Sequence, residues 1–245
     1  MLKKLIYNLC LLRNKLINRD DFTWKRYHTN YANQIKECEK ENTLRLSDKD
    51  YKVNEDRLEF YCNPSLHNNA ELIYRIIHDL KPESVFEVGC GGGDHMFNIK
   101  KIMPNIKISG CDLLQKQLDF LYERNPTLKN CVFVDDITTS PIPFKSELVY
   151  TQAVIMHLQK SNNHIDALIN LIDSSDKYII LMENWTRHNF VEDIQKISLG
   201  LKEDLYIYKV DSGKQLAMVI SKVPIINKKL NYIELKNNEE MLKYL

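Results

Sequence analysis

The stretch Val85-Phe-Glu-Val-Gly-Cys-Gly-Gly-Gly-Asp94 decides the fold. It holds four of the seven glycines in a chain of 245 residues. Glycine gathers in this way where the backbone must take positive φ angles or come close to a ligand. The apolar, β-branched residues at 84–88 predict a strand, and residues 95–103 predict a helix that stops before Pro104. The stretch therefore predicts a strand, a glycine turn and a helix whose first N–H groups face a ligand.

Short apolar runs alternate with helical patterns on both sides of this stretch. We expect helices at 68–80, 95–103, 115–124, 161–172 and 191–199, and strands at 84–88, 106–111, 131–134, 148–154, 178–182, 205–210 and 216–221. This alternation is typical of βαβ units and a parallel sheet covered on both faces. Only residues 211–214 separate the last two strands, which suits a hairpin. The sequence therefore predicts an α/β fold: a Rossmann-like, seven-stranded, mostly parallel sheet with an antiparallel last strand, plus a helical N-terminal cap.

Composition and charge limit the classes of function. The chain is 44% hydrophobic and carries 34 Lys+Arg against 33 Asp+Glu, a net charge of +1. This balance gives no overall field that favours nucleic acid or an anionic membrane. The six cysteines form no CxxC pair, and no apolar run reaches the length of about 18 residues that a spanning helix needs. We expect a cytoplasmic protein with reduced thiols.

Three regions are expected along the chain. Residues 1–66 predict a helical cap with a loop over 47–63, residues 67–224 the ligand-binding core, and residues 225–245 a C-terminal extension. The N-terminus is predicted to be an amphipathic helix, because its apolar residues follow helical spacing: Leu2, Leu5, Ile6, Leu9, Leu12 and Leu16. Such a helix packs on the body of the protein or on a partner chain, and a homodimer through it is one expectation.

The residues around the glycines discriminate between ligands. A P-loop requires Gly-Lys-Ser/Thr, whereas Asp94 and His95 follow here. A dinucleotide fingerprint requires glycine where Asp94 stands, and Glu87 would place a carboxylate beside a pyrophosphate. The missing P-loop signature disfavours a nucleoside triphosphate, and the repulsion between like charges disfavours NAD and FAD. Glu87 favours a ligand with a positively charged group.

The segment Glu87-Val-Gly-Cys-Gly-Gly-Gly93 resembles the first motif of class I S-adenosylmethionine-dependent methyltransferases, E/D-x-G-x-G-x-G. Asp112 follows the glycine segment by about 20 residues. In Rossmann folds, an acid at this distance along the sequence binds the ribose hydroxyls. Asp136, rather than Asp135, matches the acid that contacts the adenine amino group. Glu147 stands where this family more usually has Asp. The resemblance implies S-adenosyl-L-methionine as cofactor, bound by Glu87, Gly89, Cys90, Gly91, Gly93, Asp112, Leu113, Asp136, Ile137 and Gln152.

The resemblance also implies that the protein aligns the methyl donor with a deprotonated acceptor. His157, just after the fourth expected strand, is the leading candidate for a general base, and His188 and Glu183 are further catalytic candidates. A wall of the acceptor site is expected from Tyr27, Tyr31, Asn184, Trp185 and Arg187. No metal is expected, because the spacing of His157, Glu183 and His188 carries no known ligand signature.

Three functions remain open from the sequence. The first is transfer of a methyl group to oxygen or nitrogen of a small molecule, for example a sugar or phosphoramidate-type group in capsule or surface polysaccharide biosynthesis. The second is methylation of RNA or DNA, which the near-zero net charge and the absence of a (D/N)PPY motif after the fourth strand disfavour. The third is a non-catalytic assembly protein that keeps the methyltransferase fold.

Overall fold

The computed structural model describes residues 45–54, 57–61, 66–158, 163–201 and 204–242. They divide into two compact units at the Asp135–Asp136 boundary, which falls within the predicted core 67–224. The N-terminal amphipathic segment and Tyr27 and Tyr31 lie outside the described residues, so the predicted cap helices and the homodimer through them stay predictions. Among the described helices, none combines the length and the apolar composition needed to cross a membrane.

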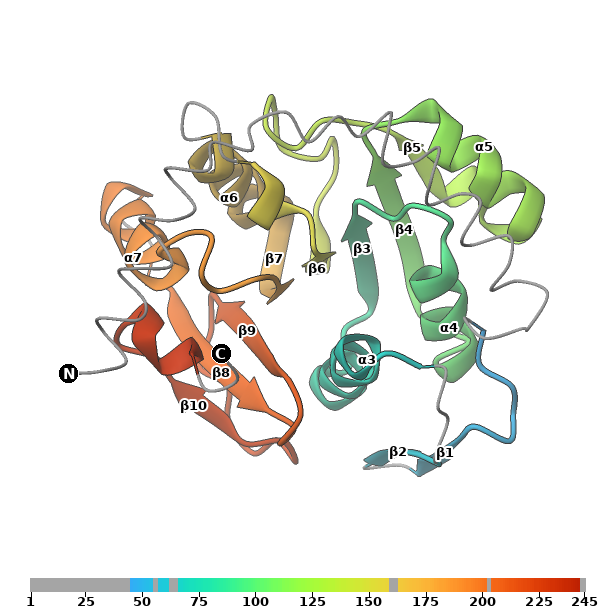
Figure 1. Ribbon diagram of the computed structural model, residues 1–245, viewed down its shortest axis with the longest axis horizontal. Helices are drawn as coiled ribbons and strands as arrows, with labels where there is room; N and C mark the ends of the chain where they lie inside the picture. The colour runs from blue at the N-terminus through green and yellow to red at the C-terminus, as the bar shows by residue number, and fades with distance from the viewer. Residues whose placement is uncertain (1–44, 55–56, 62–65, 159–162, 202–203, 243–245) are drawn as a thin grey trace. The chain divides into compact units, whose positions relative to one another are not determined.

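The unit before this boundary is built on three parallel strands (Figure 1). β4 lies between β3 and β5 and pairs in parallel with both. The helix that begins at Asn68 ends at Leu80, since Lys81 adopts a left-handed φ of 53° and Pro82 follows. The elements are α3 (Asn68–Leu80), β3 (Ser84–Val88), α4 (Asp94–Ile102), β4 (Lys107–Asp112), α5 (Gln115–Arg124) and β5 (Val132–Val134).

A β-hairpin precedes these elements, in the region where the sequence predicts a loop. β1 (Tyr51–Asn54) and β2 (Arg57–Phe60) pair in antiparallel register. The prediction of a loop is wrong for these residues. Strands of four residues among charged side chains are too short to show the alternation of apolar and polar residues by which a strand is recognised. The Phe60 ring lies 6.3 Å from the ring of Tyr74, centre to centre, which ties the hairpin to α3.

The unit after the boundary holds five strands in the order β10-β8-β9-β7-β6 (Figure 1). β6 and β7 are parallel, whereas β9 runs antiparallel to both β7 and β8. The core is formed by β7 and β9, where a run of apolar side chains is buried. The elements are β6 (Ser146–Gln152), α6 (Asn163–Ser174), β7 (Ser175–Met182), α7 (Phe190–Leu201), β8 (Tyr206–Asp211), β9 (Leu216–Ser221) and β10 (Tyr232–Glu234).

The predicted α/β class with mostly parallel strands is confirmed, and so is the antiparallel strand after the 211–214 turn. In that turn Gly213 has a φ of 82°, and its N–H donates a hydrogen bond to Oδ1 of Asp211 at 2.8 Å. The predicted count of seven strands is wrong for the described residues: besides the β1–β2 hairpin, β10 is a further strand, within the region predicted as a C-terminal extension. It was missed because Tyr232–Glu234 is too short to show alternation.

Gly110, which pairs with Glu87 in the neighbouring strand, is closely packed. A Cβ there would lie 2.9 Å from the carbonyl oxygen of Glu87 and 2.9 Å from the sulfur of Met96. We expect Gly110→Ala to lower the free energy of unfolding by about 1–3 kcal/mol, since the core cannot absorb the methyl group. Urea unfolding measures this change. The control is Gly200→Ala, where nothing lies within 4 Å of the added Cβ and helix propensity predicts a gain of up to about 1 kcal/mol. Equal effects of the two changes would contradict the packing argument.

Candidate functional site

The glycine turn connects the end of β3 at Val88 with the start of α4 at Asp94. Three of its glycines have positive φ angles: 78° at Gly89, 50° at Gly91 and 78° at Gly93. These are the three positions that the E/D-x-G-x-G-x-G motif assigns to glycine. L-residues with side chains rarely adopt such angles, so the motif spacing matches the backbone need of this turn.

The two sides of the turn differ in the space they leave. A Cβ on Gly93 would lie 2.8 Å from the side chain of Leu121, and one on Gly92 would lie 3.1 Å from the Phe120 ring. A Cβ on Gly91 meets no heavy atom closer than 3.8 Å. The turn is therefore packed against α5 on one side and leaves room beside the Gly91 backbone.

Asp112, the last residue of β4, is bonded to this turn. Its Oδ2 accepts a hydrogen bond from the N–H of Gly91 at 3.0 Å, and its Oδ1 accepts one from the N–H of Leu114 at 2.9 Å. Asp112 is 8% exposed, and its neighbour Leu113 is exposed. The carboxylate is therefore fixed at the carboxyl end of the parallel strands, where open α/β sheets bind their ligands.

Two further predicted contacts of the cofactor, Glu87 and Cys90, are buried beside Asp112. Glu87 is 2% exposed and pairs with Gly110 across the β3–β4 ladder. Burial, followed by the charges of Glu87 and Asp112, raises the pKa of the Cys90 thiol well above its usual value. Cys90 is therefore a neutral packing residue whose N–H, like that of Gly89, donates to the carbonyl of Cys111.

The remaining predicted cofactor contacts belong to the second unit. Asp136 begins it, and its Oδ1 accepts hydrogen bonds from the N–H and the hydroxyl of Thr138 at 3.0 and 2.7 Å. The carbonyl of Ile137 accepts from Asn170 at 2.7 Å. Gln152 ends β6, and its Oε1 is buried with no hydrogen-bond partner among the described residues. The cofactor roles of these three residues stay predictions.

The catalytic candidate Glu183 holds the loop that follows β6. Its Oε1 accepts hydrogen bonds from the Thr151 hydroxyl at 2.7 Å and the N–H of Val154 at 3.2 Å, and its Oε2 accepts from the N–H of Met156 at 3.0 Å. Burial raises the pKa of Glu183, against the lowering effect of these donors. The loop contains the non-glycine residue Ala153 at a φ of 54°. Backbone strain of this kind persists where surrounding contacts enforce it, and Glu183 supplies three of them.

His188 contacts the same loop. Its Nε2 lies 3.1 Å from the carbonyl oxygen of Ile155, the hydrogen-bond distance for an N–H donor. Its ring stacks on His164 with centres 3.9 Å apart and is nearly perpendicular to the Phe190 ring, whose centre lies 5.4 Å away. The structure thus gives both His188 and Glu183 contacts that fix the loop, while their catalytic roles stay predictions.

His157, the leading candidate for a general base, closes the short 3-10 turn Ile155–His157 of that loop. Burial, and then the positive charge of Arg187, lowers its pKa. The ring is therefore neutral at pH 7, the form that accepts a proton. The described residues contain no group of three or more His, Cys, Asp or Glu side chains arranged to hold a metal ion.

Two residues predicted to contact the methyl acceptor, Asn184 and Trp185, make contacts within the protein that hold the segment after β7. Asn184 Oδ1 accepts hydrogen bonds from the N–H of Thr186 at 3.1 Å and its hydroxyl at 2.8 Å. The Trp185 ring packs edge-on against Phe190, and its carbonyl accepts from Asn238 at 2.9 Å. Asn238 was missed because nothing in the sequence connects it to a segment so distant. Roles of Asn184, Trp185 and Arg187 in binding an acceptor stay predictions.

The stability of both units should fall in acid because of one histidine in each. Burial lowers the pKa to about 4 for His188 and to about 4 for His95, whose Nδ1 lies 2.8 Å from the Tyr74 hydroxyl. Both values lie below the unfolded-state pKa of about 6.5, so the unfolded chain binds more protons between these values. Each histidine makes its full contribution to the free energy of unfolding above about pH 6.5. This contribution falls by about 1.4 kcal/mol per pH unit as the pH approaches 4.

Urea unfolding at a series of pH values tests this for His188. We expect His188→Gln, which keeps a donor for the Ile155 carbonyl, to flatten the loss of stability between about pH 6.5 and pH 4. A pH dependence identical to that of the parent chain would contradict a depressed His188 pKa.

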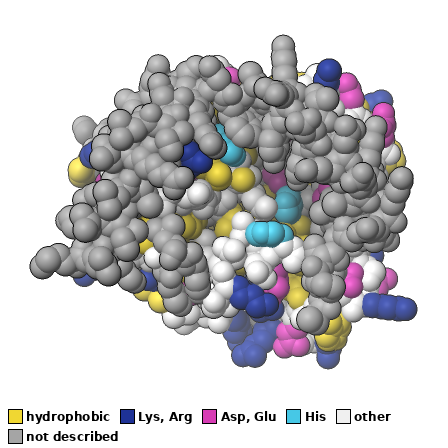
Figure 2. Space-filling view, viewed as in Figure 1, with side chains coloured by type: hydrophobic (Ala, Val, Ile, Leu, Met, Phe, Trp, Pro, Cys, Tyr) yellow, Lys and Arg dark blue, Asp and Glu magenta, His cyan; other side chains and the backbone are white. Residues whose placement is uncertain are grey.

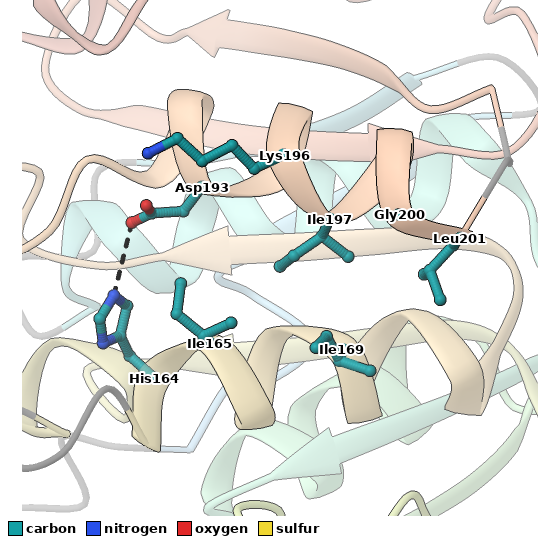
Figure 3. Close-up of a pocket in the computed structure, with 8 residues that line it drawn as sticks. All are labelled: His164, Ile165, Ile169, Asp193, Lys196, Ile197, Gly200 and Leu201. Carbon is teal, nitrogen blue, oxygen red and sulfur yellow. Dashed lines mark ion pairs between the residues drawn. The ribbon is translucent and has the colours of Figure 1, made fainter.

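A pocket of about 550 Å³ lies between α6 and α7 (Figure 3). Nε2 of His164 lies 3.4 Å from Oδ2 of Asp193 across the pocket, and Lys196 extends from α7 near them. Its other lining residues are Ile165, Ile169, Ile197, Gly200 and Leu201. This pocket lies between two helices of the unit after the boundary, and its residue His164 is the one on which the His188 ring stacks.

Comparison with known proteins finds no family model that matches the chain. A curated relative is tRNA N(3)-methylcytidine methyltransferase trm141 of Schizosaccharomyces pombe, which is 33% identical over 101 residues. The match covers 40% of this chain and 40% of that protein, so the chain spans less than half the length of its curated relative.

Among solved structures, the chain is similar to S-adenosylmethionine-bound CalS10, an amino pentose methyltransferase of Micromonospora echinaspora. The TM-score is 0.52 at 12% sequence identity, over 64% of this chain and 91% of that one. At such low identity the similarity concerns the fold. The fold implied by the glycine motif is thus confirmed: this chain has the Rossmann-like fold of class I S-adenosylmethionine-dependent methyltransferases.

Proposed function

We propose that the chain is an S-adenosylmethionine-dependent methyltransferase that acts on an oxygen or nitrogen atom of a small molecule. The observation that carries this proposal is the bond between the Gly91 N–H and the Asp112 carboxylate, at 3.0 Å. It joins the glycine turn to an acid at the end of the next parallel strand. A ligand lying along this turn would meet backbone N–H groups and a fixed carboxylate, the combination that recognises a ribose.

The residues present fit S-adenosylmethionine in charge and in space. Glu87 and Asp112 are acidic, as a cationic ligand with ribose hydroxyls requires, and a Cβ at Gly91 would meet only Oε1 of Gln117, at an ordinary contact distance of 3.8 Å. The curated relative and the solved structure with the same fold are both methyltransferases, which supports the same chemistry. In this proposal Glu87, the motif glycines and Asp112 hold the donor.

When bound, S-adenosylmethionine supplies a methyl group already activated for transfer by its sulfonium. The chain's task is then to orient the two reactants, exclude water and remove the acceptor's proton. We propose His157 as the general base: a nitrogen of its neutral ring would accept the proton from the methyl acceptor. Glu183 and His188 hold the loop on which His157 lies.

Calorimetry on the full chain tests this function. We expect S-adenosylhomocysteine and S-adenosylmethionine to bind with dissociation constants in the micromolar range, about −8 kcal/mol. NAD serves as the matched control, because Glu87 would lie beside its pyrophosphate. Absence of heat with both sulfur ligands, or tighter binding of NAD, would reject the proposal.

The acceptor we propose is a sugar hydroxyl, amine or phosphoramidate-type group. This proposal is supported by the near-zero net charge of the chain. It is also supported by CalS10, which has the same fold and is an amino pentose methyltransferase. In the view of Figure 2, acidic side chains of the described residues lie beside basic ones at the edge of the visible face. Mass spectrometry of sugar-nucleotide mixtures incubated with the chain and S-adenosylmethionine should reveal one added methyl group.

Methylation of tRNA is the second candidate, and the curated relative favours it. An RNA enzyme neutralises phosphates and therefore binds with a steep dependence on salt. Retention of transfer RNA that weakens as salt rises, together with methyl incorporation into the RNA, would establish this candidate. Incorporation into sugars alone would dismiss it.

A further inference from the structure

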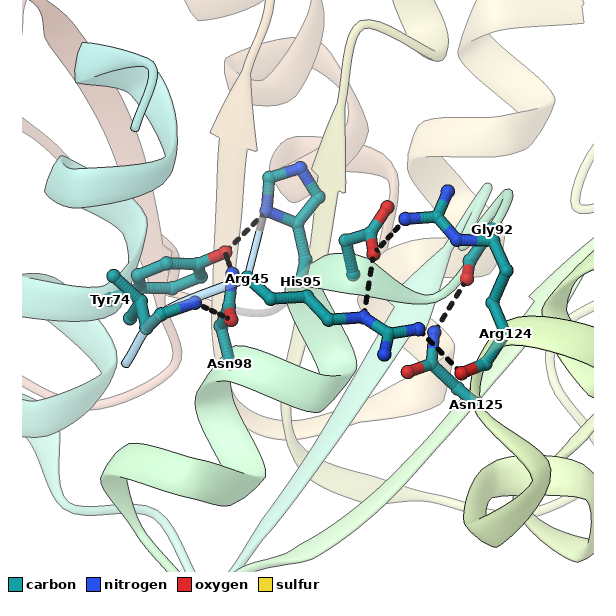
Figure 4. Close-up of polar contacts among 9 residues, drawn as sticks. Arg45, Tyr74, Gly92, His95, Asn98, Arg124 and Asn125 are labelled. Atoms are coloured by element: carbon teal, nitrogen blue, oxygen red, sulfur yellow. Dashed lines mark hydrogen bonds and ion pairs between the residues drawn. The ribbon is translucent and has the colours of Figure 1, made fainter. Parts of the chain in front are cut away.

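Polar side chains at the carboxyl end of α5 hold the outer side of the glycine turn (Figure 4). Asn125 Nδ2 donates a hydrogen bond to the carbonyl oxygen of Gly92 at 2.9 Å. Arg124 Nη2 lies 2.6 Å from Oδ1 of Asp94, the first residue of α4. One contact therefore fixes the turn itself, and the other fixes the start of the helix that follows.

The contacts of Arg124 are largely shielded from water. Its side chain is 4% exposed and that of Asp94 is 16% exposed. The Arg124 guanidinium also lies over the Phe120 ring, 4.9 Å from its centre. Breaking an ion pair in such surroundings is costly, because loss of either partner leaves a buried charge.

A second arginine reinforces the arrangement from outside α5. Arg45 donates to the carbonyl oxygen of Arg124 at 2.5 Å, and its Nε lies 3.8 Å from Asp94 Oδ1. Arg45 also lies over the Phe97 ring of α4, 5.0 Å from its centre. Asp94 is therefore turned toward two guanidinium groups.

This arrangement accounts for the one glycine of the turn that the methyltransferase motif does not require. Gly92 does not have a positive φ, yet a Cβ there would lie 3.1 Å from Phe120 and 3.2 Å from Arg124 Nη1. The close approach of α5 therefore explains why residue 92 is a glycine. The hydrogen bond from the Gly91 N–H to Asp112 holds the turn from the neighbouring strand β4. The backbone of the turn is therefore fixed both by α5 and by β4.

We propose that Arg124 and Asn125 are positioning residues that set the affinity of the glycine turn for the methyl donor without contacting it. This inference rests on the proposed function, since it takes the turn to be the donor site. A turn held in its binding conformation before the ligand arrives loses less conformational freedom on binding, which raises affinity.

Calorimetry with S-adenosylhomocysteine tests the proposal with variants Arg124→Gln, Asn125→Ala and Asp94→Asn. We expect each to weaken binding by about tenfold or more, because the turn must then be ordered by the ligand. The double variant Asp94→Asn with Arg124→Gln should bind about as weakly as either single variant, because the two residues act as one pair. Arg124→Lys, which keeps the charge facing Asp94, should recover part of the affinity.

The chain supplies a matched control in α3. Arg75 pairs with Glu71 at 2.7 Å and lies over the Phe60 ring, so it has the same kinds of partner as Arg124 in a more exposed place. Arg75→Gln should leave binding unchanged. Affinities are measured well below each variant's thermal midpoint, so that loss of stability alone does not alter them.

The outcomes separate this proposal from the proposed function. If the parent chain binds S-adenosylhomocysteine and the Arg124 and Asn125 variants bind it equally well, the positioning role falls and the function stands. Equal weakening by Arg75→Gln would also overturn the positioning role. A parent chain that does not bind S-adenosylhomocysteine overturns both.

Discussion

Asp112→Ala is expected to weaken binding of S-adenosylhomocysteine by about 10- to 100-fold, which is about 1.4–2.7 kcal/mol. The carboxylate is the acceptor for the N–H groups of Gly91 and Leu114, and in the proposed site it also accepts the ribose hydroxyls. Hydrogen bonds to a charged group contribute about 1.5–3 kcal/mol each, so the loss is large. Calorimetry on the folded variant measures it.

Asp119→Ala is the control for this change, since Asp119 is an exposed acid on α5 that accepts a hydrogen bond from Gln115 of its own helix. It should bind the ligand as the parent does. Asp112→Asn keeps one acceptor oxygen and should lie between the parent and Asp112→Ala. Unchanged affinity in Asp112→Ala would exclude Asp112 from the donor site.

Glu183→Ala is expected to lower the free energy of unfolding by about 3 kcal/mol and to abolish methyl transfer. The change leaves the Thr151 hydroxyl and the N–H groups of Val154 and Met156 without their acceptor in a buried place. The loop that carries His157 would then lose its fixed conformation. Urea unfolding and turnover with the identified acceptor measure the two effects.

Glu183→Gln separates a positioning role from a catalytic one. The amide keeps one acceptor oxygen but turns an NH₂ group toward a backbone donor, so a positioning role predicts partial loss of both stability and turnover. A catalytic carboxylate would instead lose turnover with stability intact. Glu147→Gln, which removes the negative charge beside Lys177 at the start of β6, is the control and should change stability by less than about 1 kcal/mol.

The glycine turn could be predicted from sequence because its cause is local. The φ angles at Gly89, Gly91 and Gly93 depend on residues within the turn itself, and the strand and helix beside it show their own periodicity. Asp112 could be placed for the same reason, because a parallel strand brings its last residue to the edge where the turn lies.

The contacts of Glu183 and His188 could not be predicted in this way. Both residues bond to a loop about 30 positions earlier in the chain, between the parallel strands β6 and β7. The sequence showed that polar residues gather after β7, but not whether their side chains face a ligand or a neighbouring loop. Arg124 and Asn125 were missed for a related reason: a helix end before Pro126 looks like an ordinary helix stop until the fold brings it to Gly92.

A crystal structure of the chain with S-adenosylhomocysteine tests the central claim most directly. The account predicts the ribose hydroxyls within hydrogen-bond distance of the Asp112 carboxylate and the ligand lying along the Gly89–Gly93 backbone. A ligand bound elsewhere, for example in the pocket between α6 and α7, would contradict the assignment of the glycine turn as the methyl-donor site.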